Sequence, residues 1–406
     1  MSTRTSAAAE LREQVRAIGR IGADPAGGVT RLAYTPAERE AHALLAAWAA
    51  DLGAGVDVDA VGNTVCVFDD REPYLLVGSH LDTVRHGGDY DGVAGVLVGL
   101  AAARRFAPEH HGLRVVAFAG EEGARFGRPN LGSALAAGYL GSADAQRLVD
   151  QAGVNLVSAA SDVGFDLRRP DVWLDQRVAG FIECHIEQGR VLEATGTSIG
   201  LVDAIAGSIR MRVAFAGTAA HSGATPMGLR RDAFLAAAEA ALAVEAAARI
   251  GRQTVATVGK VEVGPNSITT VPGSAVISVD IRDVDPETQR RCARQVVDAL
   301  HEIAERRDVG VEVDVISSQA PVMLASWLRN ELRAACEDAA IPYRVLPSGA
   351  GHDAAIAARR TDAAMVFIPC RDGISHSPDE DASEEDLALA VDVVVAGLER
   401  IDRAGA

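Results

Sequence analysis

The segment Tyr74-Leu-Leu-Val-Gly-Ser-His-Leu-Asp82 places polar side chains directly after a run of apolar residues. The apolar run predicts a buried strand, and the carboxyl ends of strands are where α/β sheets build their sites. His80 and Asp82 lie two residues apart, so their side chains point the same way on an extended chain. A carboxylate in this position can orient an imidazole towards a metal. A His-x-Asp pair alone is equally consistent with a purely structural contact.

Strand-like and helix-like segments alternate on both sides of this strand. Strands are predicted at 65–68, 113–120, 343–346 and 364–368, and helices at 92–106, 326–339, 352–358 and 384–401. Such an alternation predicts an α/β fold, with a mostly parallel sheet that helices cover on both faces.

The order of the elements changes in the middle of the chain. Strand, helix, strand, strand, helix and strand are predicted at 209–216, 231–250, 254–263, 275–282, 286–306 and 309–316. This βαββαβ order is that of a small ferredoxin-like α+β domain. We therefore expect a discontinuous α/β domain at 1–207 and 321–406, with a second domain inserted at 208–320.

Composition narrows the class of protein. With 406 residues, of which 48% are hydrophobic and 23% charged, the chain has the profile of a globular protein of two domains. Its net charge of −17 argues against nucleic-acid binding, which needs a basic face. No signal peptide and no apolar run of membrane-spanning length is visible. Five scattered cysteines without a CxxC pair indicate reduced thiols, so we expect a cytoplasmic protein with no membrane partner.

Further acidic residues follow the same structural logic. Asp91 ends a glycine-rich loop at the start of a predicted helix, where main-chain N–H groups favour an anion; helix capping would explain it, and capping does not exclude metal binding. Glu121 and Glu122 follow the strand at 113–120, and adjacent carboxylates repel each other unless a cation or proton neutralises them. On an extended backbone they would point apart, one towards a metal and one towards substrate. A solvated acidic turn is the alternative.

Two histidines complete a ligand set of nitrogen and oxygen atoms. His185 lies in Phe181-Ile-Glu-Cys-His-Ile-Glu-Gln-Gly189, and His376 lies in Gly373-Ile-Ser-His-Ser-Pro378. Either histidine alone would more often be structural. Together the candidate ligands are His80, Asp91, Glu122, His185 and His376. Zinc takes such ligands, and one bridging carboxylate with two further ligands per ion suffices for a pair of ions roughly 3.5–4 Å apart.

These segments, taken in order along the whole chain, resemble the peptidase M20 superfamily of dinuclear zinc hydrolases. The resemblance is carried by Gly78-Ser-His-Leu-Asp-Thr-Val84, Glu121-Glu-Gly-Ala-Arg-Phe126, His185-Ile-Glu-Gln-Gly189, His221-Ser-Gly-Ala-Thr-Pro-Met227 and Ser348-Gly-Ala-Gly-His-Asp353. The chain looks most like the branch of N-carbamoyl-L-amino-acid hydrolases, allantoate amidohydrolases and β-ureidopropionases, the hydantoinase/carbamoylase family amidases. The histidine at 185 fits this branch, since related peptidases usually have a carboxylate there.

The resemblance implies a role for each candidate residue. Asp91 would bridge two divalent ions per subunit, with His80 and His185 on one ion and Glu122 and His376 on the other. Zinc is the expected metal, and manganese, cobalt or nickel could replace it. Glu121 would be the general base that takes a proton from the attacking water, and Asp82 would support His80. The inserted domain would act as a lid and dimerise. On it, Arg282 would grip a substrate carboxylate, and His221 would stabilise the tetrahedral intermediate, in some members across the dimer interface. Gln188, Gly349 and His352 match substrate-side positions.

Three features leave alternatives open. Ser208 stands where the family often has glutamine and Thr269 where it often has asparagine; both side chains are shorter and leave room for a larger acyl group. Arg282 could instead form a surface ion pair with Asp280 or Asp283. The expected function is metal-dependent hydrolysis of the C–N bond of an N-carbamoyl L-amino acid or a similar compound. The alternatives are an N-acyl-amino-acid amidohydrolase or M20-type peptidase, and a non-catalytic metal-binding protein, against which the retained Glu121 argues.

Overall fold

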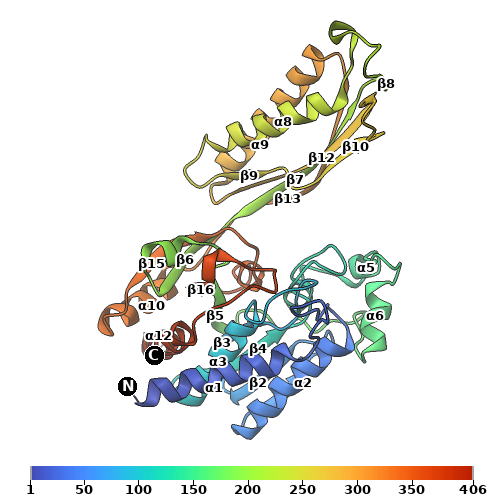
Figure 1. Ribbon diagram of the computed structural model, residues 1–406. Helices are drawn as coiled ribbons and strands as arrows, with labels where there is room; N and C mark the ends of the chain where they lie inside the picture. The colour runs from blue at the N-terminus through green and yellow to red at the C-terminus, as the bar shows by residue number, and fades with distance from the viewer. Residues whose placement is uncertain (1, 405–406) are drawn as a thin grey trace. The chain divides into compact units, whose positions relative to one another are not determined.

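The chain forms two compact units. The computed structural model describes residues 2–404, with side chains from residue 7 onwards. The first unit runs to Asp203 and resumes at Leu324, and it contains both ends of the chain (Figure 1). The second unit is the intervening segment Ala204–Met323.

A mixed sheet forms the centre of the first unit, with strand order β1-β2-β4-β3-β5-β16-β6-β14 and with β15 paired to β6. The strands are β1 (Gly55–Val58), β2 (Thr64–Asp69), β3 (Tyr74–His80), β4 (Gly112–Phe118), β5 (Val178–Ile186), β6 (Ile199–Ile205), β14 (Val322–Met323), β15 (Tyr343–Ser348) and β16 (Ala363–Ile368). All seven residues of β3 are buried, as the apolar run predicts.

Strand direction corrects one sequence-based expectation. The four central strands, β4, β3, β5 and β16, run parallel to one another. Outside them, β2 is antiparallel to β4 and to β1, and β6 is antiparallel to β16 and to β14. The prediction of a mostly parallel sheet is therefore wrong for the outer strands. Parallel neighbours need a long crossover, whereas β1 and β2 are joined by a short turn, which imposes the antiparallel direction.

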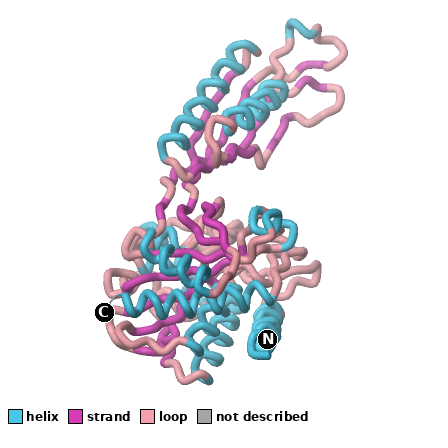
Figure 2. The backbone as a smooth tube through the Cα atoms, turned by 90° about the vertical axis from the view of Figure 1, so that its left-hand side faces the viewer, coloured by secondary structure: helices cyan, strands magenta, loops and turns pink. Residues whose placement is uncertain are grey.

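Helices cover the strands of the first unit, as the magenta strands and cyan helices of Figure 2 show. They are α1 (Ser2–Gly19), α2 (Pro36–Asp51), α3 (Val93–Arg105), α4 (Leu131–Ala136), α5 (Ser142–Ala145), α6 (Leu156–Asp162), α7 (Val191–Thr195), α10 (Ser326–Asp338), α11 (Asp353–Ala357) and α12 (Glu384–Ala404), with a 3-10 turn η2 (Arg371–Gly373). The main core lies where α1, α3, α10 and α12 pack on alternate side chains of the central strands, such as Leu75, Val77 and Ile182. The α/β class predicted from the alternating elements is confirmed.

The second unit has the βαββαβ order of a ferredoxin-like domain. Its elements are β7 (Gly207–Ala216), β8 (Ala220–His221), η1 (Met227–Leu229), α8 (Ala233–Ala248), β9 (Val255–Thr257), β10 (Val261–Gly264), β11 (Thr270–Val271), β12 (Ser274–Asp283), α9 (Pro286–Arg306) and β13 (Gly310–Gln319). The antiparallel sheet has the order β10-β12-β7-β13, and α8 and α9 pack on one face of it. A separate two-stranded sheet joins β8 and β11.

One predicted strand of this unit is interrupted. The segment 254–263 forms β9 and β10 rather than a single strand. Thr257 pairs with Asp280, whereas Val261 pairs with Ile277, so four steps on one side correspond to three on the other. One extra residue of this kind is a β-bulge, and Gly259 lies within it. Within residues 2–404, no helix combines the length and apolarity that a membrane span requires.

Candidate metal centre

The four parallel strands bring the candidate ligands to one edge of the sheet. Their carboxyl ends lie side by side in the order β4, β3, β5, β16. Glu122 follows β4, His80 ends β3, His185 lies near the end of β5, and His376 follows β16. Asp91 precedes α3, the helix that follows β3 in the chain. Residues far apart in sequence therefore meet because parallel strands end at the same edge.

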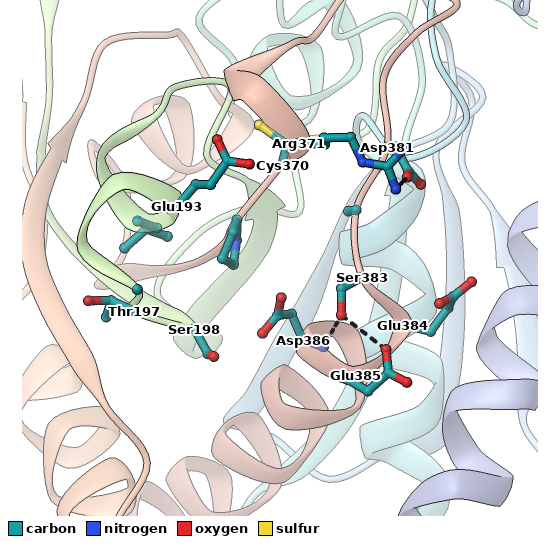
Figure 3. Close-up of a pocket in the computed structure, with 14 residues that line it drawn as sticks. Glu193, Thr197, Ser198, Cys370, Arg371, Asp381, Ser383, Glu384, Glu385 and Asp386 are labelled. Carbon is teal, nitrogen blue, oxygen red and sulfur yellow. Dashed lines mark hydrogen bonds and ion pairs between the residues drawn. The ribbon is translucent and has the colours of Figure 1, made fainter.

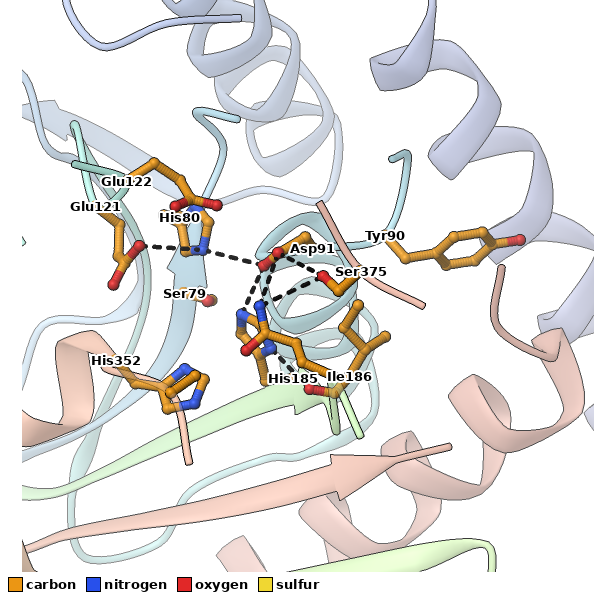
Figure 4. A network of polar contacts seen from close by, with 12 residues as sticks. Ser79, His80, Tyr90, Asp91, Glu121, Glu122, His185, Ile186, His352 and Ser375 are labelled. Carbon is orange, nitrogen blue, oxygen red and sulfur yellow. Dashed lines mark hydrogen bonds and ion pairs between the residues drawn. The ribbon is translucent and has the colours of Figure 1, made fainter. Parts of the chain in front are cut away.

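Two groups of ligand atoms share Asp91. His80, Asp91 and His185 form one group, and Asp91, Glu122 and His376 form the other; within each group the atoms lie within 4.8 Å of one another. Asp91 Oδ1 lies 3.0 Å from Nε2 of His185 and 3.6 Å from Nε2 of His80. Asp91 Oδ2 lies 3.1 Å from Nε2 of His376, which is also 3.1 Å from Glu122 Oε1. Each carboxylate oxygen of Asp91 therefore faces a different group, and Figure 4 shows the contacts of the first.

The hydrogen bonds of the two buried imidazoles show that this donor set fits a cation. Nδ1 of His80 lies 3.1 Å from the main-chain oxygen of Asp82, and Nδ1 of His185 lies 2.9 Å from that of Ile186. A carbonyl oxygen can only accept a hydrogen bond, so Nδ1 carries a proton in both rings. In the neutral form of each ring, Nε2 then has a free lone pair, which points towards Asp91. Asp91 Oδ1 is buried and has no hydrogen-bond partner among the described residues. Lone pairs that converge on a carboxylate oxygen fit a bound cation between them.

Burial and charge shift the pKa values of these groups. Burial alone would raise the pKa of Asp91, but the imidazoles of His185, His376 and His80 hold it well below its usual range. Hydrogen bonds that His376 donates to the carboxylates of Asp91 and Glu122 raise the pKa of His376 to about 11. Burial raises the pKa of Glu121 well above its usual range, because the ionised carboxylate loses its water.

Asp82 holds the strand end together. Its two carboxylate oxygens accept the main-chain N–H groups of Glu121, at 2.8 Å, and Glu122, at 2.9 Å. Oδ1 also lies 3.4 Å from Nδ1 of His80. Asp82 therefore links the ends of β3 and β4, beside His80 as the two-residue spacing predicts. Glu121 and Glu122 face different ligand residues, since Glu121 Oε2 lies 3.9 Å from Nε2 of His80 while Glu122 Oε1 lies 3.1 Å from Nε2 of His376.

Two of the three predicted substrate-side residues of the first unit contact these groups. Gln188 Nε2 donates to Asp91 Oδ2 at 2.9 Å. His352 is buried, its ring centroid lies 4.6 Å from that of His185, and its Nε2 contacts the hydroxyl of Ser348 at 2.8 Å. Gly349 lies in the loop between β15 and α11.

The other predicted residues belong to the second unit and form two pairs. Ser208 on β7 is the cross-strand partner of Arg282 on β12. The guanidinium of Arg282 donates to Asp280 at 2.9 Å, so the ion pair considered from the sequence is present. Thr269 precedes β11, and its carbonyl accepts the N–H of Ser222 beside His221. Nδ1 of His221 accepts the N–H groups of Gly223 and Ala224, at 3.1 and 3.2 Å, which leaves the proton of the neutral ring on Nε2.

Sequence reasoning missed several polar residues around the ligands. Glu380 Oε1 accepts the N–H groups of Tyr90 and Asp91, and the Ser375 hydroxyl lies 3.0 Å from Asp91 Oδ2. Glu183 accepts from the Ser79 hydroxyl and from the N–H of Ala354. Glu183 could have been found, because it lies two residues before His185 on the same face of a strand. Ser375 and Glu380 lie in a loop, where no periodicity indicates side-chain direction.

A separate cavity of about 680 Å³ shares no residue with the ligand groups (Figure 3). It lies beside the first turn of α12, where Glu384, Glu385 and Asp386 follow Ser383. Ser383 Oγ accepts the N–H of Asp386 at 3.2 Å, which caps the helix. Carboxylates in a first turn are stabilised by the helix dipole, which explains the three acidic residues of α12 at this cavity.

The fold and the paired ligand groups define the class of protein. An α/β sheet whose parallel strands present two groups with a shared carboxylate, and a further glutamate beside them, is typical of a hydrolase that uses two metal ions.

Comparison with known proteins gives the family. Residues 76–400 match the model of peptidase family M20/M25/M40. The chain is 37% identical to the N-carbamoyl-L-amino acid amidohydrolase of Geobacillus stearothermophilus, over 95% of this chain and 96% of that protein. It is 37% identical to the allantoate amidohydrolase of Escherichia coli K12, over 94% and 95% of the two chains. An amidase of the hydantoinase/carbamoylase family from Burkholderia multivorans superposes with a TM-score of 0.90, at 33% identity over 97% of both chains. The chain therefore belongs to peptidase family M20/M25/M40, and it is a hydrolase of carbon–nitrogen bonds other than peptide bonds.

Proposed function

We propose that this protein hydrolyses the C–N bond of an N-carbamoyl L-amino acid or a closely similar ureido compound. The observation that carries the proposal is the pair of ligand groups that share Asp91, with Glu121 beside them. The names of the relatives support the ureido group, since they act on N-carbamoyl amino acids and on allantoate.

One divalent ion would be held by His80 and His185, and a second by Glu122 and His376. Asp91 would contact both ions. Zinc suits these nitrogen and oxygen donors best. Bound there, the two ions would polarise the substrate carbonyl and lower the pKa of a water between them. The unpartnered Asp91 Oδ1 supports this assignment, as do the Nδ1 contacts that leave the Nε2 lone pairs pointing inwards.

Glu121 is the general base in this proposal. It takes a proton from the attacking water on one carboxylate oxygen and delivers it to the leaving nitrogen. Burial raises the pKa of Glu121 well above its usual range, which suits a group that must hold a proton between two steps. Asp82 contributes by fixing the main chain of Glu121 and the ring of His80.

The proposal assigns a role to four residues of the second unit. His221 donates from Nε2 to the developing oxyanion, and its Nδ1 contacts support the required tautomer. Arg282 binds the substrate carboxylate, for which its planar fork is suited, while Asp280 orients the guanidinium. Ser208 and Thr269 line the side of the substrate together with Gln188, Gly349 and His352.

The second unit also serves as a lid and as the surface of a homodimer in this proposal. Large apolar side chains on it are strongly exposed, with Ile268 at 98% and Leu229 at 75%, which supports a covering partner. The small-molecule substrate and the acidic chain argue for no nucleic-acid partner. All five cysteines are unpaired and buried, which supports a reducing cytoplasm.

A substrate panel tests the proposal. The metal-loaded enzyme is given N-carbamoyl and N-acetyl forms of the same L-amino acids, and an N-carbamoyl amino-acid amide that lacks the carboxylate. We expect ammonia and free amino acid in equal amounts from the N-carbamoyl acid, little turnover of the amide, and none by Glu121→Gln. Release of acetate without ammonia would instead identify an N-acyl-amino-acid hydrolase. If neither class of substrate were turned over, the proposal that the protein hydrolyses such compounds would be rejected.

A further inference from the structure

Asn130 is a buried residue that contacts Glu121 twice. Its main-chain N–H donates to the carbonyl of Glu121 at 2.7 Å, and its side-chain Nδ2 donates to Glu121 Oε1 at 2.8 Å. Only 7% of Asn130 is exposed. Asn130 precedes α4 in a left-handed conformation, with φ 58° and ψ 42°, which asparagine tolerates better than most residues.

A second carboxylate fixes the orientation of the Asn130 amide. Nδ2 lies 3.3 Å from Oδ1 of Asp353, the fully buried first residue of α11. The hydroxyl of Ser133 donates to the same Asp353 oxygen. An amide nitrogen carries two protons, and here each faces a carboxylate oxygen. The reversed amide would place its carbonyl oxygen against two carboxylates, so Asp353 and Glu121 together decide which end of Asn130 faces Glu121.

The hydrogen bond from Asn130 leaves only one carboxylate oxygen of Glu121 directed at the ligand groups. Oε1 accepts a hydrogen bond from Nδ2 of Asn130. Oε2 lies 3.9 Å from Nε2 of His80, a contact that Figure 4 draws. The carboxylate cannot rotate without breaking the bond to Asn130. A general base must be held close to the productive geometry, because a displacement of about 1 Å can cost on the order of 10²-fold in rate.

We propose that Asn130, oriented by Asp353, is a positioning residue that fixes the carboxylate of Glu121 with Oε2 turned towards the reacting water. The inference rests on the proposed role of Glu121 as general base. It adds Asn130, Asp353 and the Ser133 hydroxyl to the residues on which the reaction depends. The hydrogen bonds that carry this role join these residues to Glu121 and to one another, not to a candidate metal ligand.

Asn130→Gly tests the inference with little disturbance of the backbone. Glycine accepts the left-handed conformation and keeps the main-chain N–H that donates to Glu121. We expect kcat to fall by about 10- to 100-fold, with KM within about twofold and metal content unchanged. The matched control is Asn266→Gly, the same substitution at an exposed residue with φ 56°, which should leave kcat unchanged.

Two variants of Asp353 separate positioning from folding. Asp353→Asn keeps an oxygen that can accept from Asn130 and should retain most of kcat, whereas Asp353→Leu should lower it as Asn130→Gly does. Because both residues act through one contact, adding Asp353→Leu to Asn130→Gly should cost little more. A residue that only stabilised the fold would lower Tm and leave kcat of the folded enzyme intact.

Wild-type kcat in folded Asn130→Gly would overturn the inference, and so would a crystal structure of that variant in which the Glu121 carboxylate keeps its orientation. The proposed function is tested separately by Glu121→Gln. If Glu121→Gln is inactive and Asn130→Gly is normal, only the inference fails. If Glu121→Gln remains active, the role of Glu121 as base fails and the inference fails with it.

Discussion

Asp91 contributes more to the proposed centre than any other single residue, because its two oxygens face different ligand groups. The imidazoles of His80, His185 and His376 surround its carboxylate, and the first two are buried. The Ser375 hydroxyl and the Gln188 amide contact Oδ2. Glu380 fixes its main chain through the N–H groups of Tyr90 and Asp91. The position of the carboxylate is thus determined from several sides, as a bridging ligand requires.

The same surroundings predict how metal affinity depends on pH. Contacts with Asp91 and Glu122 raise the pKa of His376 to about 11, and neighbouring carboxylates raise the pKa of His80 and His185 despite the opposing effect of burial. At neutral pH the His376 imidazole therefore carries a proton in the metal-free protein, and it must lose that proton to bind an ion. Raising the pH from 6 to 8 should strengthen zinc binding by about tenfold per unit for every proton released.

Zinc titrations in competition with a chelator, at pH 6, 7 and 8, measure this dependence. Replacement of an exposed imidazole, His301→Gln, provides the control and should leave the slope unchanged. Affinity that is independent of pH would mean that histidines are not the ligands.

At the scale of elements, the turn between β3 and α3 decides whether His80 can reach its position. Gly92 has φ 69°, and a Cβ atom there would lie 2.5 Å from the ring of His80. The ring therefore occupies the space that any side chain at position 92 would need. Residue 92 lies between Asp91 and the first residue of α3. Only glycine fits there, because it has no side chain to collide with the His80 ring.

Gly92→Ala should therefore displace the His80 ring and weaken the ion shared by His80 and His185. We expect a loss of about 1–3 kcal/mol in the free energy of unfolding from backbone strain. Metal analysis should show fewer than two ions per chain after dialysis. Gly141→Ala is the control, because no heavy atom lies within 4 Å of a Cβ built at Gly141. A Gly92→Ala variant with full metal content and unchanged Tm would contradict this explanation.

Elements also explain which features could be predicted from the sequence. The apolar runs of β3 and β4 predict buried strands, and polar residues at their ends predict a site, because parallel strands end at one edge. The direction of β2 and β6 could not be predicted, since apolar patterning does not encode strand direction. Asn130 could not be found either, because its contact with Glu121 depends on a left-handed turn that no periodicity indicates.

At the scale of the whole molecule, the proposed reaction needs both units. The ligand groups and Glu121 belong to the first unit, and His221 and Arg282 belong to the second. If the proposed homodimer places His221 in the site of the other subunit, two inactive variants should complement each other. Mixing His221→Ala with Glu121→Gln should restore about a quarter of wild-type activity, since half of randomly paired dimers are mixed and each has one intact site.

The activity of the mixture, measured after dissociation and reassembly of the subunits, tests this arrangement. Each variant alone is the control and should stay inactive at every concentration. A dimer that regains no activity would place His221 in its own subunit's site or outside the reaction.

The most direct test of the account is anomalous X-ray scattering from crystals of the zinc-loaded protein, recorded above and below the zinc edge. The account predicts two peaks on opposite sides of the Asp91 carboxylate, roughly 3.5–4 Å apart. His80 and His185 should bind one, and Glu122 and His376 the other. Peaks elsewhere, or one ion that leaves a group empty at saturating zinc, would contradict it.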